Sequence, residues 1–138
     1  MLVTASRTWE DGYTIFRVLN EILNEQGTPL TVIHGDAERG GDHITRMWCE
    51  VHPAGMIDQK RCPVTPEHWR RLGRAAGQVR NQWMVDNYGP HLCVAFLRPC
   101  GQEGCPRKGL HWSHGAEGCL EYAKAKGVPV RTLEAVMV

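Results

Sequence analysis

Leu30-Thr31-Val32-Ile33-His34, followed by the glycine-containing segment 35–41 and a run with Ile44 and Trp48, decides the fold. The five quoted residues are largely apolar and β-branched, which is typical of a buried strand. The apolar residues after the glycines recur at helical spacing, and Asp42 is placed to cap that helix. A strand, a glycine loop and a helix in this order form the repeating unit of a parallel α/β sheet.

The flanking segments continue this unit. Segment 49–66 contains three prolines and predicts a loop, with a short strand near Cys49–His52. The remaining expected elements are strands at 1–5, 92–97 and 128–133, and helices at 15–26, 67–76, 78–88 and 116–126. The sequence therefore predicts one Rossmann-like α/β domain of three layers over residues 1–138, with a mostly parallel sheet of about five strands.

Composition excludes several other classes of protein. With 138 residues, 42% hydrophobic and 22% charged, the chain matches an ordinary globular domain rather than a disordered or collagen-like one. No apolar run approaches the roughly 18 residues that a membrane helix needs, and no basic-then-apolar leader follows Met1. We therefore expect a cytoplasmic protein without a membrane partner. In that compartment six cysteines are more readily thiols or metal ligands than a disulfide framework.

The net charge of +1 conceals an uneven distribution. Residues 1–58 carry four basic and nine acidic side chains, whereas residues 59–80 carry six basic side chains and one acidic one. A local basic segment in a neutral protein favours a small anionic ligand over long nucleic acid. The alternative is a helix face that is simply solvated.

Three loops offer backbone N–H groups to a phosphate. Ser6-Arg7, the segment from Gly35 through Gly40 and Gly41 to Asp42, and Gly115-Ala116 follow or face the carboxyl ends of predicted strands. In an open parallel sheet these ends line the crevice where ligands bind, and helix N-termini there attract anions. The alternative is that the glycines only turn strand into helix. The spacing is not G-x-G-x-x-G, so the dinucleotide fingerprint of oxidoreductases is absent.

Arg74, Arg80 and Asn81 are further candidates for binding this anion. A guanidinium holds phosphate or carboxylate oxygens in a bidentate geometry that lysine cannot copy. We expect Arg80 to face outward from the first turn of a helix. The alternative is a surface arginine paired with Asp86 or Glu67.

Catalysis would require a carboxylate near a sugar, to position water or stabilise positive charge. Asp36, Asp42 and Glu117 lie near predicted strand ends, and Glu117 is the best catalytic candidate. For Asp42 we favour the helix N-cap described above. His34 ends a buried strand, where a packed and hydrogen-bonded histidine is more common than a general base.

The loop 98–114 carries the spacing Cys100-x₄-Cys105-x₅-His111-x₂-His114. Zinc prefers four thiolate or imidazole ligands in a tetrahedron, so this spacing predicts a structural zinc site that fixes the loop. Cys119 could replace His114 as the fourth ligand. A disulfide between the first two cysteines is the alternative under oxidising conditions.

The other cysteines and the tryptophans have simpler expectations. We expect Cys93, Trp48 and Trp83 in the core, and Cys49 and Cys62 as free thiols. We expect Trp9 and Trp112 in loops beside the crevice, where they could stack on a nucleobase.

Several of these motifs occur in one order that resembles a known superfamily. The motifs are Thr4-Ala5-Ser6-Arg7, His34-Gly35-Asp36 through Gly40-Gly41-Asp42, His52-Pro53-Ala54, Gly73-Arg74-Ala75-Ala76-Gly77 with Arg80-Asn81, and Met84-Val85-Asp86. The order resembles the SLOG superfamily, specifically its YspA/YpsA-related branch, which is common in actinobacteria and their phages, and includes members with a Cys/His insertion before the last helix. The resemblance implies a Rossmann-like fold that binds nucleotides or nucleotide-derived ligands. Relatives in the superfamily are the LOG phosphoribohydrolases and the single-strand DNA-binding protein DprA.

The sequence departs from the superfamily at two places. Ala5 stands where the first loop usually has glycine, and Gly118 and Cys119 fall where LOG enzymes carry acidic residues. We therefore expect binding, sensing or sequestration of a nucleotide-derived small molecule. The alternative is a LOG-like phosphoribohydrolase or N-glycosidase acting on nucleoside monophosphates. Single-stranded DNA binding ranks third because the net charge is only +1. We also expect a homodimer or higher homo-oligomer.

Overall fold

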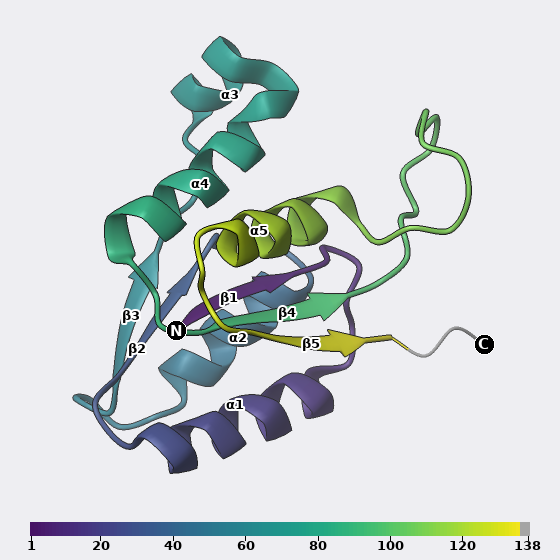
Figure 1. Ribbon diagram of the computed structural model, residues 1–138. Coiled ribbons are helices and arrows are strands. Elements are labelled where there is room, and N and C mark those ends of the chain that lie inside the picture. Colours follow the sequence, from purple (N-terminus) through teal and green to yellow (C-terminus); the bar gives the residue numbers. More distant parts are fainter. Residues whose placement is uncertain (136–138) are drawn as a thin grey trace.

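Five parallel strands form the sheet of the computed structural model, which describes residues 1–135 (Figure 1). The strands are β1 (Leu2–Ala5), β2 (Leu30–His34), β3 (Ile57–Arg61), β4 (Cys93–Leu97) and β5 (Val130–Glu134). They lie in the order β3-β2-β1-β4-β5, and every neighbouring pair is parallel. The predicted α/β class and parallel sheet are confirmed.

Helices cover both faces of this sheet and give three layers. The helices are α1 (Gly12–Gln26), α2 (Gly41–Glu50), α3 (Pro66–Leu72), α4 (Ala76–Tyr88) and α5 (His114–Ala125), with a 3₁₀ turn, η1, at Gly73–Ala75. Helices α1 and α2 pack on one face, and α4 and α5 pack on the other (Figure 1). None of these helices is long and apolar enough to cross a membrane.

The core follows from the apolar central strands. All five residues of β4 are buried, as is expected when helices cover both faces of a parallel strand. One core cluster joins the strands to α1 and α2 through residues such as Ile15 and Trp48, and another joins them to α4 and α5 through Met84 and Cys119. The predictions of core positions for Trp48 and Cys93 are confirmed.

The expected short strand at Cys49–His52 is wrong. These residues end α2 and its turn, and the strand lies instead at Ile57–Arg61. This strand escaped prediction because it is Ile-Asp-Gln-Lys-Arg, with only one apolar residue. It forms an edge of the sheet, where polar side chains face water.

Two expectations for helices are also wrong. Asp42 does not cap α2, because the helix begins at Gly41 and Gly40 occupies the N-cap position. Trp83 is not in the core: it lies on the outer face of α4 with 48% of its surface exposed and packs edge-on against Tyr88. Helix α4 carries aromatic and aliphatic residues on both faces, so its pattern does not reveal which face is buried.

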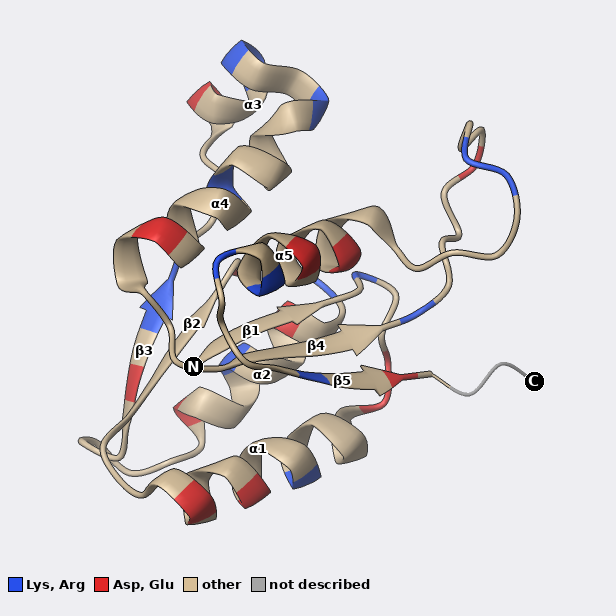
Figure 2. Cartoon of the chain, viewed as in Figure 1, with Lys and Arg blue, Asp and Glu red and all other residues tan. Residues whose placement is uncertain are grey.

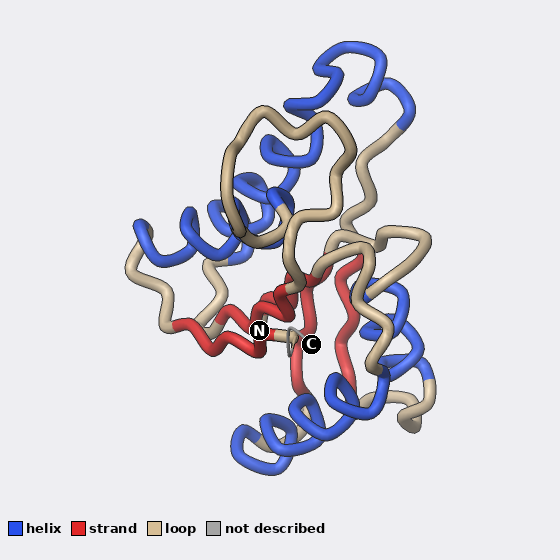
Figure 3. The backbone as a smooth tube through the Cα atoms, turned by 90° about the vertical axis from the view of Figure 1, so that its right-hand side faces the viewer, coloured by secondary structure: helices blue, strands red, loops and turns tan. Residues whose placement is uncertain are grey.

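The segment Pro66–Ala75, comprising α3 and η1 and here called the arm, stands away from the sheet (Figure 1). None of its residues is buried. The basic residues of segment 59–80 spread over β3, the arm and α4 (Figure 2). The arm and the loop after β4 both project from the carboxyl edge of the sheet, which faces the viewer in Figure 3.

Candidate functional site at the carboxyl edge of the sheet

Ser6, directly after β1, joins the loops of this edge to one another. Its side chain is buried, its Oγ accepts a hydrogen bond from the Arg98 backbone N–H at 2.8 Å, and it contacts the Ser113 hydroxyl. Its carbonyl accepts hydrogen bonds from the N–H groups of Trp9 and Gly41. Ser6 therefore ties the loop after β1 to α2 and to both ends of the loop after β4.

Two adjacent glycines allow α2 to start against this loop. A Cβ on Gly40 would lie 2.3 Å from the Arg7 carbonyl oxygen, and one on Gly41 would lie 2.0 Å from the Ala5 Cβ. Gly40 also has a φ of +76°, which L side chains rarely adopt. The glycines are thus required for close packing of one protein backbone on another, whatever else the loop binds.

Asp42 is a buried carboxylate in the first turn of α2. It is 7% exposed, and its Oδ2 accepts a hydrogen bond from the Ala37 N–H at 3.2 Å. Burial raises the pKa of this carboxyl group, and the nearby positive charges of Arg80 and Arg7 act in the opposite direction. Among the residues that the structure describes, Asp42 is the only acidic side chain that is buried.

Arg80 points inward, contrary to the expected outward position. Its Nη1 donates hydrogen bonds to the carbonyls of Gly35 at 2.6 Å and Cys62 at 2.9 Å, and its Nε donates to Asn81 Oδ1 at 2.9 Å. Burial lowers the pKa of this guanidinium, and Asp42 acts in the opposite direction. The carbonyls after β2 and β3 therefore hold Arg80 in place, and the alternative pairing with Asp86 or Glu67 is wrong.

Asp86 and Gly35 show why Arg80 turns inward. Asp86 is instead bonded to the Tyr122 hydroxyl at 2.8 and 2.9 Å. A Cβ on Gly35 would lie 2.6 Å from the Arg80 guanidinium carbon, so the glycine leaves room for the arginine. Asn81 completes the anchor, because its Nδ2 donates to the Gly115 carbonyl at 3.3 Å.

Arg7 and the arm meet at the rim of this site. Arg7 is exposed, and its guanidinium lies 6.0 Å from the centre of the Trp69 ring. Trp69 is 41% exposed, whereas Trp9, expected beside the crevice, is 4% exposed and packs against Phe96. Arg74 lies exposed on η1 rather than beside Arg80.

The helix starts at this edge differ in how they are capped. Helices α1 and α3 have side-chain caps, in which Asp11 accepts from the Thr14 N–H and Thr65 accepts from the His68 N–H. Helices α2 and α5 have no side-chain cap: Gly40 has no side-chain acceptor, and the Ser113 hydroxyl is engaged with Ser6 instead. Uncapped N–H groups at a helix start are well suited to an anion.

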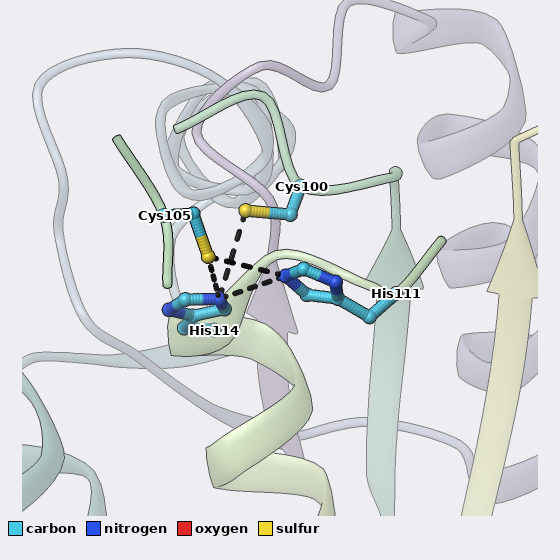
Figure 4. Close-up of side chains that lie close together, drawn as sticks. All are labelled: Cys100, Cys105, His111 and His114. Atoms are coloured by element: carbon cyan, nitrogen blue, oxygen red, sulfur yellow. Dashed lines mark hydrogen bonds between the residues drawn. The ribbon is translucent and has the colours of Figure 1, made fainter. Parts of the chain in front are cut away.

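Cys100, Cys105, His111 and His114, here called the Cys/His cluster, converge in front of α5 (Figure 4). One ligand atom from each lies within 4.8 Å of all the others. The sulfur of Cys105 lies 3.3 Å from His114 Nε2 and 3.5 Å from His111 Nε2, and the two Nε2 atoms are 3.0 Å apart. These four residues could hold a metal ion.

The backbone around the cluster fixes its ligands. The His111 Nδ1–H donates to the Gly109 carbonyl at 2.8 Å, which leaves Nε2 free to bind a metal. The Cys100 N–H donates to the His111 carbonyl at 2.7 Å, and Pro99 pairs with Trp112 in an antiparallel bridge. Backbone contacts therefore close the loop at its base, independently of the contacts among the four ligands. Cys119 is not part of the cluster, because its side chain is buried in the core.

The cysteines fall into two groups. All six are free thiols, and only those of the cluster are partly exposed. Burial raises the pKa of Cys119 to about 11 and that of Cys93 to about 12. The buried thiols therefore keep their protons at neutral pH and are poor metal ligands.

Glu117 and Asp36, the other acidic candidates, are each paired with an arginine. Glu117 is on the first turn of α5, and its Oε1 lies 3.3 Å from Arg107 of the loop after β4. Asp36 accepts from Arg61 at 2.9 Å. His34 is fully buried and hydrogen-bonded to Gln59 at 2.7 Å, so the expectation of a packed histidine is confirmed.

Gln78 is a residue of this site that the sequence reasoning did not identify. Its Nε2 donates to the His114 carbonyl at 3.1 Å, and its amide lies over Gly118, where a Cβ would be 2.5 Å from Oε1. Gly118 is thus small because a neighbouring glutamine occupies the space. Trp69 was also not identified from the sequence, because nothing in its local sequence indicates that the arm brings it close to Arg7.

The structure also has a cavity away from this edge. It has a volume of about 430 Å³ and opens at the amino edge of the sheet, with lining residues that include Met1, Thr31, Tyr88 and His91. A smaller cavity of about 140 Å³ lies beside the Cys/His cluster and is lined by Pro99, Leu110, His111 and Trp112. Charge and uncapped helix starts, rather than volume, identify the carboxyl edge as the candidate site.

Comparison with known proteins agrees with this architecture. The model of the YspA, cpYpsA-related SLOG family matches residues 1–63, which contain β1, α1, β2, α2 and β3. The chain is also similar to the Gene 61 protein of Mycobacterium phage D29, with 34% identity over 134 residues that cover 94% of this chain and 92% of the relative. The chain belongs to the YspA, cpYpsA-related SLOG family. No solved structure matches it.

Proposed function

We propose that this protein binds a nucleotide-derived small molecule at the carboxyl edge of its sheet, as a binding, sensing or sequestering module. The observation that carries the proposal is the start of α2, which has no side-chain cap, packs against the Arg7 backbone and follows the loop whose Gly35 carbonyl binds Arg80. Burial raises the pKa of the adjacent Asp42 carboxyl group, and both arginines act in the opposite direction. Membership of the SLOG family, which suggests a nucleotide-related role, supports the same ligand class.

The proposed binding site for the phosphate of this ligand, here called the anion site, consists of four groups of residues. Ser6 and Arg7 form the loop after β1; Gly35, Gly40, Gly41 and Asp42 form the loop and helix start after β2; Arg80, Asn81 and Gly115 lie opposite them; Arg74 adds charge from the arm. The first turns of α2 and α5 supply N–H groups to a phosphate. Trp69, beside Arg7, supplies a flat aromatic surface on which a nucleobase can stack.

The Cys/His cluster fits zinc in the proposal. Zinc bonds of about 2.3 Å to sulfur and 2.0–2.1 Å to nitrogen place tetrahedral ligands about 3.3–3.8 Å apart. The sulfur–nitrogen distances of 3.3, 3.5 and 3.6 Å agree with this spacing, and the 3.0 Å between nitrogens is slightly shorter. All four ligands come from the protein, which is typical of a structural zinc site.

Calorimetric titration with a panel of nucleoside monophosphates, dinucleotides and cyclic nucleotides tests the ligand class. Saturable binding is expected, and Arg7→Met should weaken it at least tenfold, since a charge-assisted pair contributes roughly 1.5–3 kcal/mol. Arg71→Met, which removes the same charge from an exposed position on the arm, is the matched control. Equal losses in both variants would indicate a general charge effect and refute the site.

Chromatography of the same mixtures separates binding from turnover. The proposal expects intact nucleotide after incubation. Steady release of free base that stops in Glu117→Gln would instead identify a phosphoribohydrolase or N-glycosidase. Binding of a single-stranded oligonucleotide that weakens steeply with salt would revive the DNA-binding alternative.

Two further expectations need separate measurements. Elemental analysis should give about one zinc per chain, and Cys100→Ser with Cys105→Ser should abolish it; less than half an ion per chain would exclude the zinc site. Light scattering should give at least the mass of a dimer, and a monomer would exclude the expected homo-oligomer. The cytoplasmic location stays a prediction that cell fractionation can check.

A further inference from the structure

The Cys/His cluster and the anion site share one structural element. His114 is at once a member of the cluster and the first residue of α5. Ser113, the preceding residue, contacts Ser6 in the loop after β1. Any movement of the cluster therefore moves both the start of α5 and a contact of the anion site.

A second set of contacts runs through α4. Gln78 holds the carbonyl of His114, and Asn81 holds the carbonyl of Gly115. Asn81 is 4% exposed and also accepts the hydrogen bond from Arg80 Nε. The first turn of α5 is thus connected through Asn81 to Arg80, the partly buried side chain that supplies a positive charge in the proposed function.

We propose that metal binding by the Cys/His cluster sets the geometry of the anion site, so that metal and nucleotide bind with positive coupling. Without the metal, the Nε2 atoms of His111 and His114 have only each other and the Cys105 sulfur as shared partners within the cluster, and the loop 98–113 is held mainly by its base. The start of α5 then loses one of its anchors and keeps the contact of Ser113 with Ser6 and those with Gln78 and Asn81, which act as positioning residues. The nucleotide ligand in this proposal rests on the proposed function, whereas the expected effect of the metal on Arg80 does not.

The first experiment follows the metal alone. Zinc is titrated into metal-stripped protein while NMR follows the backbone amides of Ser6 and Gly115 and the Nε–H of Arg80. Shifts that saturate at one zinc per chain in all three signals are expected. Shifts confined to residues 98–113 would overturn the proposal, whether or not any nucleotide binds.

The second experiment measures the coupling itself, with AMP and inorganic phosphate as probes. Zinc-loaded protein should bind AMP about tenfold more tightly than stripped protein, and AMP should raise zinc affinity by the same factor, because coupling is reciprocal. Equal AMP affinities with and without zinc would overturn the proposal. Failure of both probes to bind the loaded protein, with the NMR response intact, would refute the proposed ligand and leave the metal effect standing.

Gln78→Ala tests the route through α4. This variant should retain zinc at one ion per chain and lose most of the difference between loaded and stripped protein. Gln82→Ala, the same change on an exposed position of the same helix, is the matched control and should keep the full difference. If both variants keep it, the contacts through Gln78 do not carry the coupling.

Discussion

Helices α2 and α5 start at the same edge of the sheet without side-chain caps, yet their starts are held in different ways. Backbone packing holds α2, because Gly40 and Gly41 press against Arg7 and Ala5. The start of α5 does not need a glycine for close packing at Gly115, since a Cβ there would have no atom within 4 Å. Its position depends on the Cys/His cluster and on side chains from α4.

This difference shows that one edge of the sheet can combine a helix start that the chain itself holds in place with another whose position depends partly on a bound metal. The start of α2 is held by backbone packing at Gly40 and Gly41 and needs no bound metal. The start of α5 is held by Gln78 and Asn81 of α4 and by the Cys/His cluster, whose four side chains a bound metal would join more strongly. Substitutions and metal removal should therefore affect the two sides unequally.

The largest effect is expected from Gly40→Ala. The added Cβ would meet the Arg7 carbonyl and would require a positive φ, so the free energy of unfolding should fall by about 2–4 kcal/mol. Urea unfolding followed by circular dichroism measures this loss. Gly115→Ala is the control on the α5 side and should change stability by less than about 1 kcal/mol; a similar loss there would remove the distinction between the two helix starts.

Metal removal is expected to have the next largest effect. Zinc at 100 times its dissociation constant should raise the free energy of unfolding by up to about 2.7 kcal/mol, if the unfolded chain does not bind it. Hydrogen exchange should become faster in residues 98–118 of stripped protein and stay unchanged in residues 40–45. Faster exchange in both segments would mean that the α2 side also depends on the metal.

Alkaline pH should destabilise the fold through the buried thiols Cys93 and Cys119. In the folded protein the thiols of Cys93 and Cys119 have pKa values of about 12 and 11, whereas in the unfolded chain both return to the ordinary value of 9.0. Proton loss therefore favours unfolding, and stability should fall as the pH rises from 9 to 11, by on the order of 1 kcal/mol per cysteine at pH 10. Denaturant unfolding at pH 8 and pH 10 checks this, and Cys119→Ala should reduce the fall.

The smallest effect is expected from Arg107→Ala, which removes the ion pair with Glu117. The arginine is 55% exposed, so the free energy of unfolding should change by less than about 1 kcal/mol, and less at high salt. Thermal unfolding at two salt concentrations measures it. A large loss would show that this pair, rather than the cluster, holds the loop after β4.

The apolar pattern of the sequence predicted the buried strands because their environment is uniform. It failed at β3, where a polar edge strand has no apolar alternation, and at Trp83, where both faces of α4 carry apolar residues. The four cluster residues were predictable because they lie close together in the sequence. The inward turn of Arg80 was not predictable, because its partners Gly35 and Cys62 come from loops far away in the chain.

The local spacing of the Cys/His cluster also bears on how the protein folds. Its four ligands lie within residues 100–114, whereas the neighbouring strands β1 and β4 pair residues about ninety positions apart. Local contacts form faster than pairings of this separation. We therefore expect the metal to bind the chain before the sheet assembles, so that a preformed loop precedes α5 during folding. Metal bound in this way also stabilises the unfolded chain, which reduces the amount by which the metal raises the free energy of unfolding.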